Sequence, residues 1–445
     1  MSDPVSSTSY PNLQRTVFGL PAIDNHAHPI LKEAHRDAFP FEGLVSEAQG
    51  TALTDDSIHT VANLRATKEL SKLYGLDENT TWEQLKEHRK TIPYPQLIER
   101  CFQPSKLQCL LLDDGLSGVD ELAEPYTAHD PFSTSPTKRI VRIEVVAERE
   151  ADRGARHSHK NPNFTGDSQG LMQTVLTPHL GTDTLDVAPI LSQFHDSLYY
   201  ALEDEARHAD VVAFKSVICY RTGLDITTFI SQASLKFSIL EIFKTYQAGG
   251  KIRLCYKALN DMVVQVALEV AASHNIPVQF HTGLGDSDLT LLLSSPARMQ
   301  AIIKAYPGTK FVLLHSSYPY TREAGYLTSV YPNVFLDFGE LRTCAYMIPE
   351  SQVFPMVSQR GQEAILRQIF ELCPTNKVMW SSDGHWWPES FYLGSLQARR
   401  VLFKVTKEMI DDGDITEDQA IVIVKKLLFE NANNLYRLGL TSDFE

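Results

Sequence analysis

The chain has 445 residues, of which 43% are hydrophobic and 22% are charged, and its formal net charge is -14 at pH 7. This composition is typical of a folded protein with a sizeable core, and the acidic balance without a basic stripe argues against a nucleic-acid partner. No stretch of about 18 consecutive apolar residues occurs, so we expect no membrane span and no membrane partner.

The first 20 residues have neither a basic head nor an apolar run, and we interpret them as an N-terminal leader that is not a secretory signal peptide. The six cysteines are scattered and form no C-x-x-C pair. Such a pattern is typical of free thiols inside a cell and not of a disulfide framework. We therefore expect a cytoplasmic protein.

Eight short apolar runs recur along the chain, each closed by polar residues and separated by stretches with helical spacing. Near-continuous apolar strands that alternate with helices are typical of a parallel sheet whose outer face is covered. Eight such units favour a closed (β/α)8 TIM barrel over an open doubly wound sheet. The expected strands lie within residues 21–29, 107–115, 139–148, 210–224, 276–285, 309–317, 332–340 and 376–384.

The later connections predict the outer helices, in residues 259–275, 295–308, 362–374 and 417–438. The interval between the first two strands, residues 31–106, is much longer than a usual connection and contains helical segments. We expect it to be a largely helical insertion over the barrel mouth, within one barrel domain spanning residues 21–445. A separate second domain is the alternative, but the barrel strands resume directly afterwards.

The first expected strand ends in His26-Ala27-His28. Residues i and i+2 of an extended chain point to the same side, so both imidazoles can face the barrel interior. Two neutral imidazoles at this spacing suit a borderline divalent ion. The pair alone is a weak signal, because His157 and His159 have the same spacing in a polar stretch that we interpret as a solvated loop.

Three further residues strengthen the metal hypothesis: His281, His315 and Asp383 close the fifth, sixth and eighth apolar runs. Apolar strands carry few titratable groups without a specific reason. In a TIM barrel the carboxyl ends of all strands meet at one face, where active sites lie. Four histidines and an aspartate at one barrel mouth therefore predict a metal site.

This set of residues resembles a known family. A His-x-His motif on the first strand, histidines on the fifth and sixth, and an aspartate on the eighth is the pattern of the amidohydrolase superfamily. In particular, the chain resembles the group that contains the N-terminal domain of fungal FluG developmental proteins and of plant nodulin–glutamine synthetase fusions. The resemblance spans residues 23 to 390 and is carried by IDNHAHPI, AFKSVICYRTGLDI, PVQFHTGLGDSD, FVLLHSSYPYTREAGYL and WSSDGHWWPE.

The resemblance implies that His26, His28 and Asp383 hold a metal in the more buried position. It implies further that His281 and His315 complete the site, either on that ion or on a second one. One or two divalent ions per chain are therefore expected. Histidine and carboxylate ligands favour Zn²⁺, and they also suit Mn²⁺ and Fe²⁺.

Lys215 ends the fourth run, where binuclear relatives carry a carboxylated lysine that bridges two ions. A lysine that faces a barrel interior needs a charge partner or must lose its charge. Three states are open: a carbamate that binds metal, a catalytic ammonium that holds a substrate carboxylate, or an ordinary ion pair with an acid such as Asp337 or Glu340.

The same set of residues predicts a mechanism. A bound Zn²⁺ lowers the pKa of water from 15.7 to about 7 and polarises a carbonyl group. Asp383 is then both a ligand and the proton shuttle between that water and the leaving nitrogen, a role typically worth about 10²–10⁴-fold in rate. His315 would polarise the carbonyl if it does not bind metal.

Weaker signals mark residues that could contact a substrate. Arg221 follows the fourth strand and can hold a carboxylate through its planar guanidinium, with a surface ion pair as the alternative. Trp386 and its neighbour Trp387 are expected to form an exposed aromatic wall at the mouth. The other candidates follow the sixth and eighth strands: Tyr318, Tyr320 and His385.

The leading interpretation is hydrolysis of a C–N (amide) bond in a small substrate, one that bears a carboxylate by analogy with the glutamine synthetase fusions. A lyase that decarboxylates or hydrates a small acid is the first alternative, favoured by a single ion and an uncarboxylated Lys215. A non-catalytic signalling or scaffold protein is the second, and the complete ligand set argues against it. A homodimer would be common for such a barrel.

Overall fold

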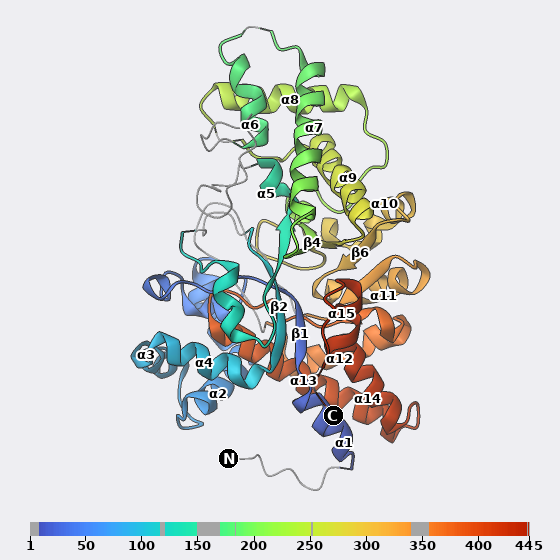
Figure 1. Cartoon of the computed structure of the whole chain (residues 1–445). Helices are drawn as coiled ribbons and strands as arrows, with labels where there is room; N and C mark the ends of the chain where they lie inside the picture. The colour runs from blue at the N-terminus through green and yellow to red at the C-terminus, as the bar shows by residue number, and fades with distance from the viewer. Residues whose placement is uncertain are drawn as a thin grey trace.

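The computed structural model describes residues 9–115, 121–148, 170–182, 184–250, 252–339, 356–442 and 444. Its centre is an eight-stranded parallel sheet in which neighbouring strands follow one another in chain order (Figure 1). The strands are β1 (Ala22–Ala27), β2 (Leu107–Asp113), β3 (Lys138–Arg142), β4 (Val211–Ser216), β5 (Pro277–Phe280), β6 (Lys310–Leu313), β7 (Val334–Asp337) and β8 (Val378–Met379).

Backbone hydrogen bonds between β1 and the segment after β8 bring the two ends of the sheet together. The N–H of Asp383 donates to the carbonyl of His26 at 3.0 Å. The N–H of His28 donates to the carbonyl of Gly384 at 2.7 Å. The (β/α)8 barrel expected from the eight apolar runs is thereby confirmed.

The barrel core explains why these strands lack the alternation of a half-exposed sheet. Every residue of β1, β2, β4 and β5 is buried. Side chains of one parity fill the interior, and those of the other parity pack under the outer helices, so both faces select apolar residues. Polar side chains are concentrated where the strands end.

The outer helices surround this sheet (Figure 1). No helix in the described ranges is long and apolar enough to cross a lipid bilayer. The helices outside the first connection are α1 (Pro11–Gly19), α5 (Ile143–Glu148), α6 (Leu171–Leu176), α7 (Val187–Ala206), α8 (Gln232–Gln247), α9 (Lys257–His274), α10 (Gln300–Ala305), α11 (Thr321–Val330), α12 (Gln359–Leu372), α13 (Pro388–Asp411), α14 (Glu417–Lys425) and α15 (Asn431–Leu435).

Several elements differ from the sequence-based expectation. The run 139–148 is strand only as far as Arg142, where α5 begins. Glu144 and Glu148 are one helical turn apart and both are buried, so the helix carries two acids to partners near β4. The expected outer helices also do not include α7, α8, α11 and α13, although α13 begins with Pro388, a residue favoured at the first helical position.

The connection between β1 and β2 forms the cap, which we define as residues 31–106. Figure 1 shows its longer helices beside α13, against which α4 packs. The cap and the segment after β8 share a second hydrophobic core, which contains Leu70, Leu85, Trp386 and Trp387. The helices of the cap are α2 (Val61–Tyr74), α3 (Trp82–Thr91) and α4 (Tyr94–Ser105), with short turns at Glu33–His35, Phe41–Leu44, Ala52–Asp56 and Ser57–His59.

A buried ion pair fastens the cap to the barrel. Nε of Arg89, in α3, lies 2.5 Å from Oε1 of Glu389, in the first turn of α13. The hydroxyl of Tyr74 donates to the same carboxylate oxygen at 2.7 Å. Because a buried charge is costly unless it is paired and hydrogen-bonded, this contact fixes α3 relative to α13.

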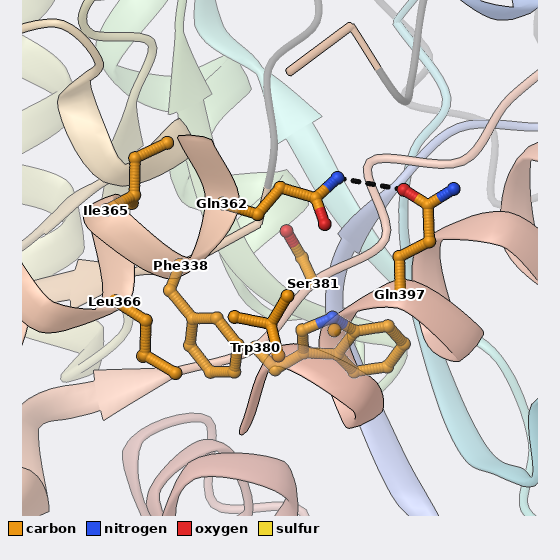
Figure 2. A pocket seen from close by; sticks show the side chains of 9 residues that line it. Phe338, Gln362, Ile365, Leu366, Trp380, Ser381 and Gln397 are labelled. Carbon is orange, nitrogen blue, oxygen red and sulfur yellow. Dashed lines mark hydrogen bonds between the residues drawn. The ribbon is translucent and has the colours of Figure 1, made fainter. Parts of the chain in front are cut away.

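A closed ring of hydrogen bonds makes a second link. Gln362 of α12 donates to Gln397 of α13 at 2.8 Å, as Figure 2 shows, and Gln397 donates to Glu69 of α2 at 2.7 Å. Arg65 of α2 closes the ring with bonds of 3.1 Å to Glu69 and 3.0 Å to Gln362. The ring borders a small hollow with mainly apolar walls, including Phe338, Ile365, Leu366 and Trp380.

Candidate metal centre

The five residues expected to bind metal lie together at the carboxyl ends of their strands. They come from β1, from the turns after β5 and β6, and from the segment after β8. Their relative exposures are 2% or less, so they face the barrel interior and not solvent. The residues are His26, His28, His281, His315 and Asp383.

Asp383 lies at the centre of this group. Its Oδ1 is 3.5 Å from Nε2 of His26 and 3.4 Å from Nε2 of His28. Its Oδ2 is 3.4 Å from Nδ1 of His315. Nitrogen and oxygen ligands at tetrahedral positions around one Zn²⁺ would be about 3.4 Å apart. The spacing of these side chains therefore matches that of a metal-ligand set.

Two overlapping triads have ligand atoms within 4.8 Å of one another: His26, His315 and Asp383, and His26, His28 and Asp113. His281 belongs to neither triad. Its ring lies beside that of His315, with a centroid separation of 4.5 Å. The geometry thus divides the expected ligands into a compact set around Asp383 and one histidine at its edge.

The hydrogen bonds of His281 test whether it can accept a metal. Its Nε2 lies 3.0 Å from the carbonyl of Leu284. A carbonyl only accepts, so Nε2 carries the hydrogen of the neutral ring. Burial is the main cause that lowers the pKa of His281 well below its ordinary value, and Lys215 and Arg142 add to it. Nδ1 is left as a lone pair, buried and without a hydrogen-bond partner among the described residues, as a metal ligand requires.

His28 is oriented by the same kind of bond. Its Nδ1 lies 3.0 Å from the carbonyl oxygen of Asp113, which ends β2. Nδ1 therefore carries the hydrogen and Nε2, the nitrogen nearer to Asp383, presents its lone pair. Two site histidines thus have their tautomers set by backbone carbonyls.

Lys215 ends β4 inside the barrel, with its Nζ 3.0 Å from Nε2 of His26. Burial lowers its pKa to about 8, while Asp113 acts in the opposite direction and Arg142 adds to the lowering. In the sheet register Lys215 pairs with Arg142 of β3, so two cationic side chains extend from adjacent positions.

The ion pair proposed between Lys215 and Asp337 is not formed. Asp337 instead accepts hydrogen bonds from Asn25, Ser381 and the backbone of Gly339, at 3.3, 2.8 and 2.6 Å. These bonds occupy both carboxylate oxygens. Glu340, the other acid considered, lies outside the described residues.

Two residues next to the site were missed by the sequence analysis. Asp113 ends the second apolar run, so the rule that singled out His281 and Asp383 would have found it too. Arg142 donates to Asp113 Oδ2 from Nε at 3.1 Å, and the expectation of a single strand over residues 139–148 hides its place at a strand end. Together they support the carbonyl that orients His28.

The backbone around the site is strained. His315 and Asp383 have φ angles of 64° and 47°, and Ser316, Ser317 and Trp386 also have positive φ. Non-glycine residues adopt this region at a cost of roughly 1–3 kcal/mol when the surrounding structure holds them there. The turns after β6 and β8 therefore hold His315 and Asp383 in unfavourable backbone conformations, which place their side chains in the site.

Arg221 does not face the metal site. Its guanidinium donates to both carboxylate oxygens of Glu148, at 2.6 and 3.1 Å, and to the carbonyl of Leu254 at 3.2 Å. The side chains of this ion pair are 4% and 1% exposed, so the expected surface pair is a buried one. The guanidinium of Arg221 is therefore bonded to Glu148 and Leu254, and the structure does not place it to hold a substrate carboxylate.

The prediction that Trp386 and Trp387 are exposed is wrong, since their relative exposures are 2% and 1%. The cap covers them, and the ring of Trp386 stacks on Phe39 with a centroid distance of 3.9 Å. His385 is buried beside them, with Nδ1 3.2 Å from the carbonyl of Asp383. The indoles thus anchor the cap.

Tyr318 and Tyr320 contact the connection after β5. The carbonyl of Tyr318 accepts from the N–H of Leu284 at 2.7 Å, and the hydroxyl of Tyr320 donates to the carbonyl of Leu291 at 3.0 Å. Gly283, in the connection after β5, has a φ of 83°, and a Cβ on this residue would lie 2.3 Å from the carbonyl oxygen of Tyr318. Glycine is required for this close approach.

A buried set of histidines and a carboxylate at the carboxyl ends of a (β/α)8 barrel is typical of metal-dependent barrel enzymes. Known proteins narrow the class. Residues 256–438 match the amidohydrolase family model. The chain is 39% identical over 441 residues to the protein fluG of Emericella nidulans. That match covers 96% of this chain and 47% of fluG, so the chain spans about half the length of this relative.

Solved structures show the same fold. A provisionally assigned metal-dependent hydrolase from Lactobacillus casei has a TM-score of 0.73 and 22% identity, over 97% of this chain and 98% of that one. A uronate isomerase from Thermotoga maritima has a TM-score of 0.59 and 14% identity, over 95% and 96%. One from Bacillus halodurans has a TM-score of 0.56 and 14% identity, over 97% and 96%. The chain therefore resembles the amidohydrolase family over residues 256–438 and shares the barrel fold of these structures.

Proposed function

We propose that this protein is a metal-dependent hydrolase that cleaves a C–N bond in a small amide bearing a carboxylate. The observation that carries the proposal is the position of Asp383, whose oxygens lie 3.4–3.5 Å from nitrogens of three histidines. A structural core has no need for this set, because burying ionisable groups costs free energy.

The residues of the compact set, His26, His28, His315 and Asp383, would hold a divalent ion, and Nδ1 of His281 is available at its edge. Such an ion, with Zn²⁺ favoured, supplies a Lewis acid and a water whose pKa is near 7. Buried neutral histidines suit this task, since a ligand nitrogen must be unprotonated. Burial lowers the pKa of His26 well below its ordinary value, which keeps its ring neutral.

Asp383 would act on protons during the reaction. Its carboxylate is positioned to take a proton from the attacking water and to return it to the leaving nitrogen, so that the amine departs neutral. The contact with His315 and the positive φ of Asp383 hold the carboxylate in one orientation. His315 would orient the scissile carbonyl wherever it does not bind metal.

Lys215 would determine the metal count. As an ammonium at 3.0 Å from Nε2 of His26 it would repel an ion bound there, and burial has already lowered its pKa to about 8. A carbamate removes the positive charge and adds a bridging anion, which favours two ions. If the ammonium persists, Lys215 offers a cation to a substrate carboxylate, and this state favours the decarboxylase or hydratase alternative.

The test begins with elemental analysis of purified protein from metal-replete growth, for the wild type, Lys215→Ala and Lys310→Ala. Lys310 is a matched control at the opposite end of the barrel, in β6. Turnover is then measured as amine release from a panel of N-acyl amino acids and γ-glutamyl amides, with Asp383→Asn as the inactive reference.

About two ions per chain, falling only in Lys215→Ala, together with amine release, would support the hydrolase. One ion in all three proteins, with release of CO₂ or hydration of small acids and no amine, would favour the lyase. A wild type that binds no metal would overturn both and leave a non-catalytic signalling or scaffold role.

A further inference from the structure

The segment after β4 carries two candidate side chains in opposite directions. The strand gives way to a short 3₁₀ turn, Ile218–Tyr220, in which successive side chains are about 120° apart. Arg221 therefore turns to Glu148, away from the site. Tyr220 turns to His281, and the hydroxyl oxygen of the tyrosine lies 3.0 Å from Nε2 of the histidine.

The direction of this hydrogen bond follows from the histidine's other contact. Nε2 of His281 must carry a hydrogen, because the carbonyl of Leu284 lies 3.0 Å away and cannot donate. A nitrogen that carries a hydrogen cannot accept one in the plane of the neutral ring. The oxygen of Tyr220 is therefore an acceptor in this contact, and its own hydrogen points elsewhere.

That hydrogen has no acceptor among the described residues. Tyr220 is half-buried, with its ring 4.9 Å from that of His281. A tyrosine hydroxyl keeps its proton at neutral pH, so this hydrogen is available to donate.

We propose that Tyr220 is a substrate-contacting residue that donates its hydroxyl hydrogen to an oxygen of the ligand bound at the metal centre. In the hydrolysis proposed above this oxygen is that of the scissile carbonyl, which gains negative charge as water adds. Tyr220 transfers no proton and forms no covalent bond. A preorganised donor of this kind is worth about 10²–10³-fold in kcat in other enzymes.

The test uses the full chain loaded with Co²⁺ and acetohydroxamate as the probe, a small oxygen chelator whose binding changes the visible absorption of Co²⁺. Titrations compare the wild type with Tyr220→Phe and with Tyr256→Phe. Tyr256 is a matched control on the flank of the barrel, where its ring contacts Phe237. Co²⁺ affinity is measured separately for each protein.

We expect the Kd for acetohydroxamate to rise about tenfold in Tyr220→Phe and to stay unchanged in Tyr256→Phe, since one hydrogen bond to a charged ligand is lost. Co²⁺ affinity should be equal in all three, because Leu284 alone sets the tautomer of His281. With an amide substrate, Tyr220→Phe should lower kcat about 100-fold and change KM by less than about threefold.

Unchanged hydroxamate affinity in Tyr220→Phe would overturn the assignment. A parallel loss of Co²⁺ affinity would also overturn it, because Tyr220 would then act only by positioning His281. The assignment depends on the metal site of the proposed function, and the two can fail separately. If the wild type binds no Co²⁺, both the metal site and the role of Tyr220 are overturned. If the wild type binds Co²⁺ and Tyr220→Phe has the same acetohydroxamate Kd, only the role of Tyr220 is overturned.

Discussion

The two ends of the barrel treat buried polar groups in opposite ways. At the amino end, the guanidinium of Arg399 is 4% exposed and bonds backbone carbonyls on two sides. It donates to Val17 and Leu20 before β1, at 2.6 and 2.9 Å, and to Ser105 and Lys106 before β2, at 3.4 Å each. Every donor direction of this side chain is directed at a protein oxygen.

At the carboxyl end the buried polar side chains are as inaccessible to solvent as Arg399, but they lie close to one another and not against backbone carbonyls alone. Nδ1 of His281 has no hydrogen-bond partner among the described residues, and Lys215 is held 3.0 Å from a histidine. His315 and Asp383 are held at positive φ. The contrast indicates that burial alone does not identify a functional site. What distinguishes the site is the concentration of ionisable side chains held close together, with a histidine nitrogen that has no hydrogen-bond partner among the described residues.

The largest expected effect is on activity at the carboxyl end. Asp383→Asn should lower kcat by at least about 10³-fold and reduce bound metal, because the amide neither carries the negative charge nor shuttles a proton. Thermal stability should not fall, since a buried negative charge is removed. Elemental analysis, turnover and calorimetry check this. Asp412→Asn, at the exposed end of α13, is the control, and a metal-replete, fully active Asp383→Asn enzyme would contradict the comparison.

At the amino end the effect should be on stability alone. Arg399→Met should lower the free energy of unfolding by about 3 kcal/mol, because several buried carbonyls lose their donor, and should leave metal content unchanged. Denaturant unfolding measures this, with Arg207→Met as an exposed control in α7's C-terminal cap. If Arg399→Met lost metal and kept its stability, the amino end of the barrel would contribute to the metal site, and the two ends would not have separate roles.

A third prediction compares a structural histidine with those of the site. His129 is buried, accepts from the N–H of Ile30 at 3.0 Å through Nε2, and has Nδ1 3.1 Å from the carbonyl of Pro125. Burial lowers its pKa from 6.5 to about 4. The neutral ring is therefore favoured in the folded state, and its stabilising contribution is present above pH 6.5 and lost as the pH falls towards 4.

Between pH 7 and pH 5 the wild type should lose about 2 kcal/mol more stability than His129→Gln, which does not titrate. Unfolding curves at the two pH values, with metal removed from both proteins, measure the difference. Equal losses would mean that His129 titrates normally in the folded state.

The smallest effect is expected at the surface. Arg322 forms a two-point ion pair with Glu371, at 2.8 and 2.9 Å, but both side chains are solvent-exposed. Such pairs are screened by water and salt. Arg322→Ala should therefore leave the thermal midpoint and the metal content unchanged, and a clear drop in either would show that exposure is a poor guide here.

The sequence by itself determined the barrel and most of the candidate metal set. Apolar runs with polar ends specify buried parallel strands, and parallel strands in chain order bring their carboxyl ends to one face. His26, His28, His281, His315 and Asp383 could be found because each residue closes such a run. The end of an apolar run is a local feature of the sequence, so it can be recognised without knowledge of the packing.

Only the tertiary structure decided which neighbours face the site. Tyr220 and Arg221 are adjacent in the chain, and a 3₁₀ turn sends one to His281 and the other to Glu148. Trp386 is buried because a cap encoded more than 280 residues earlier packs over it. Side-chain direction after a strand depends on turn geometry and on distant partners, and neither is contained in the local pattern of apolar and polar residues.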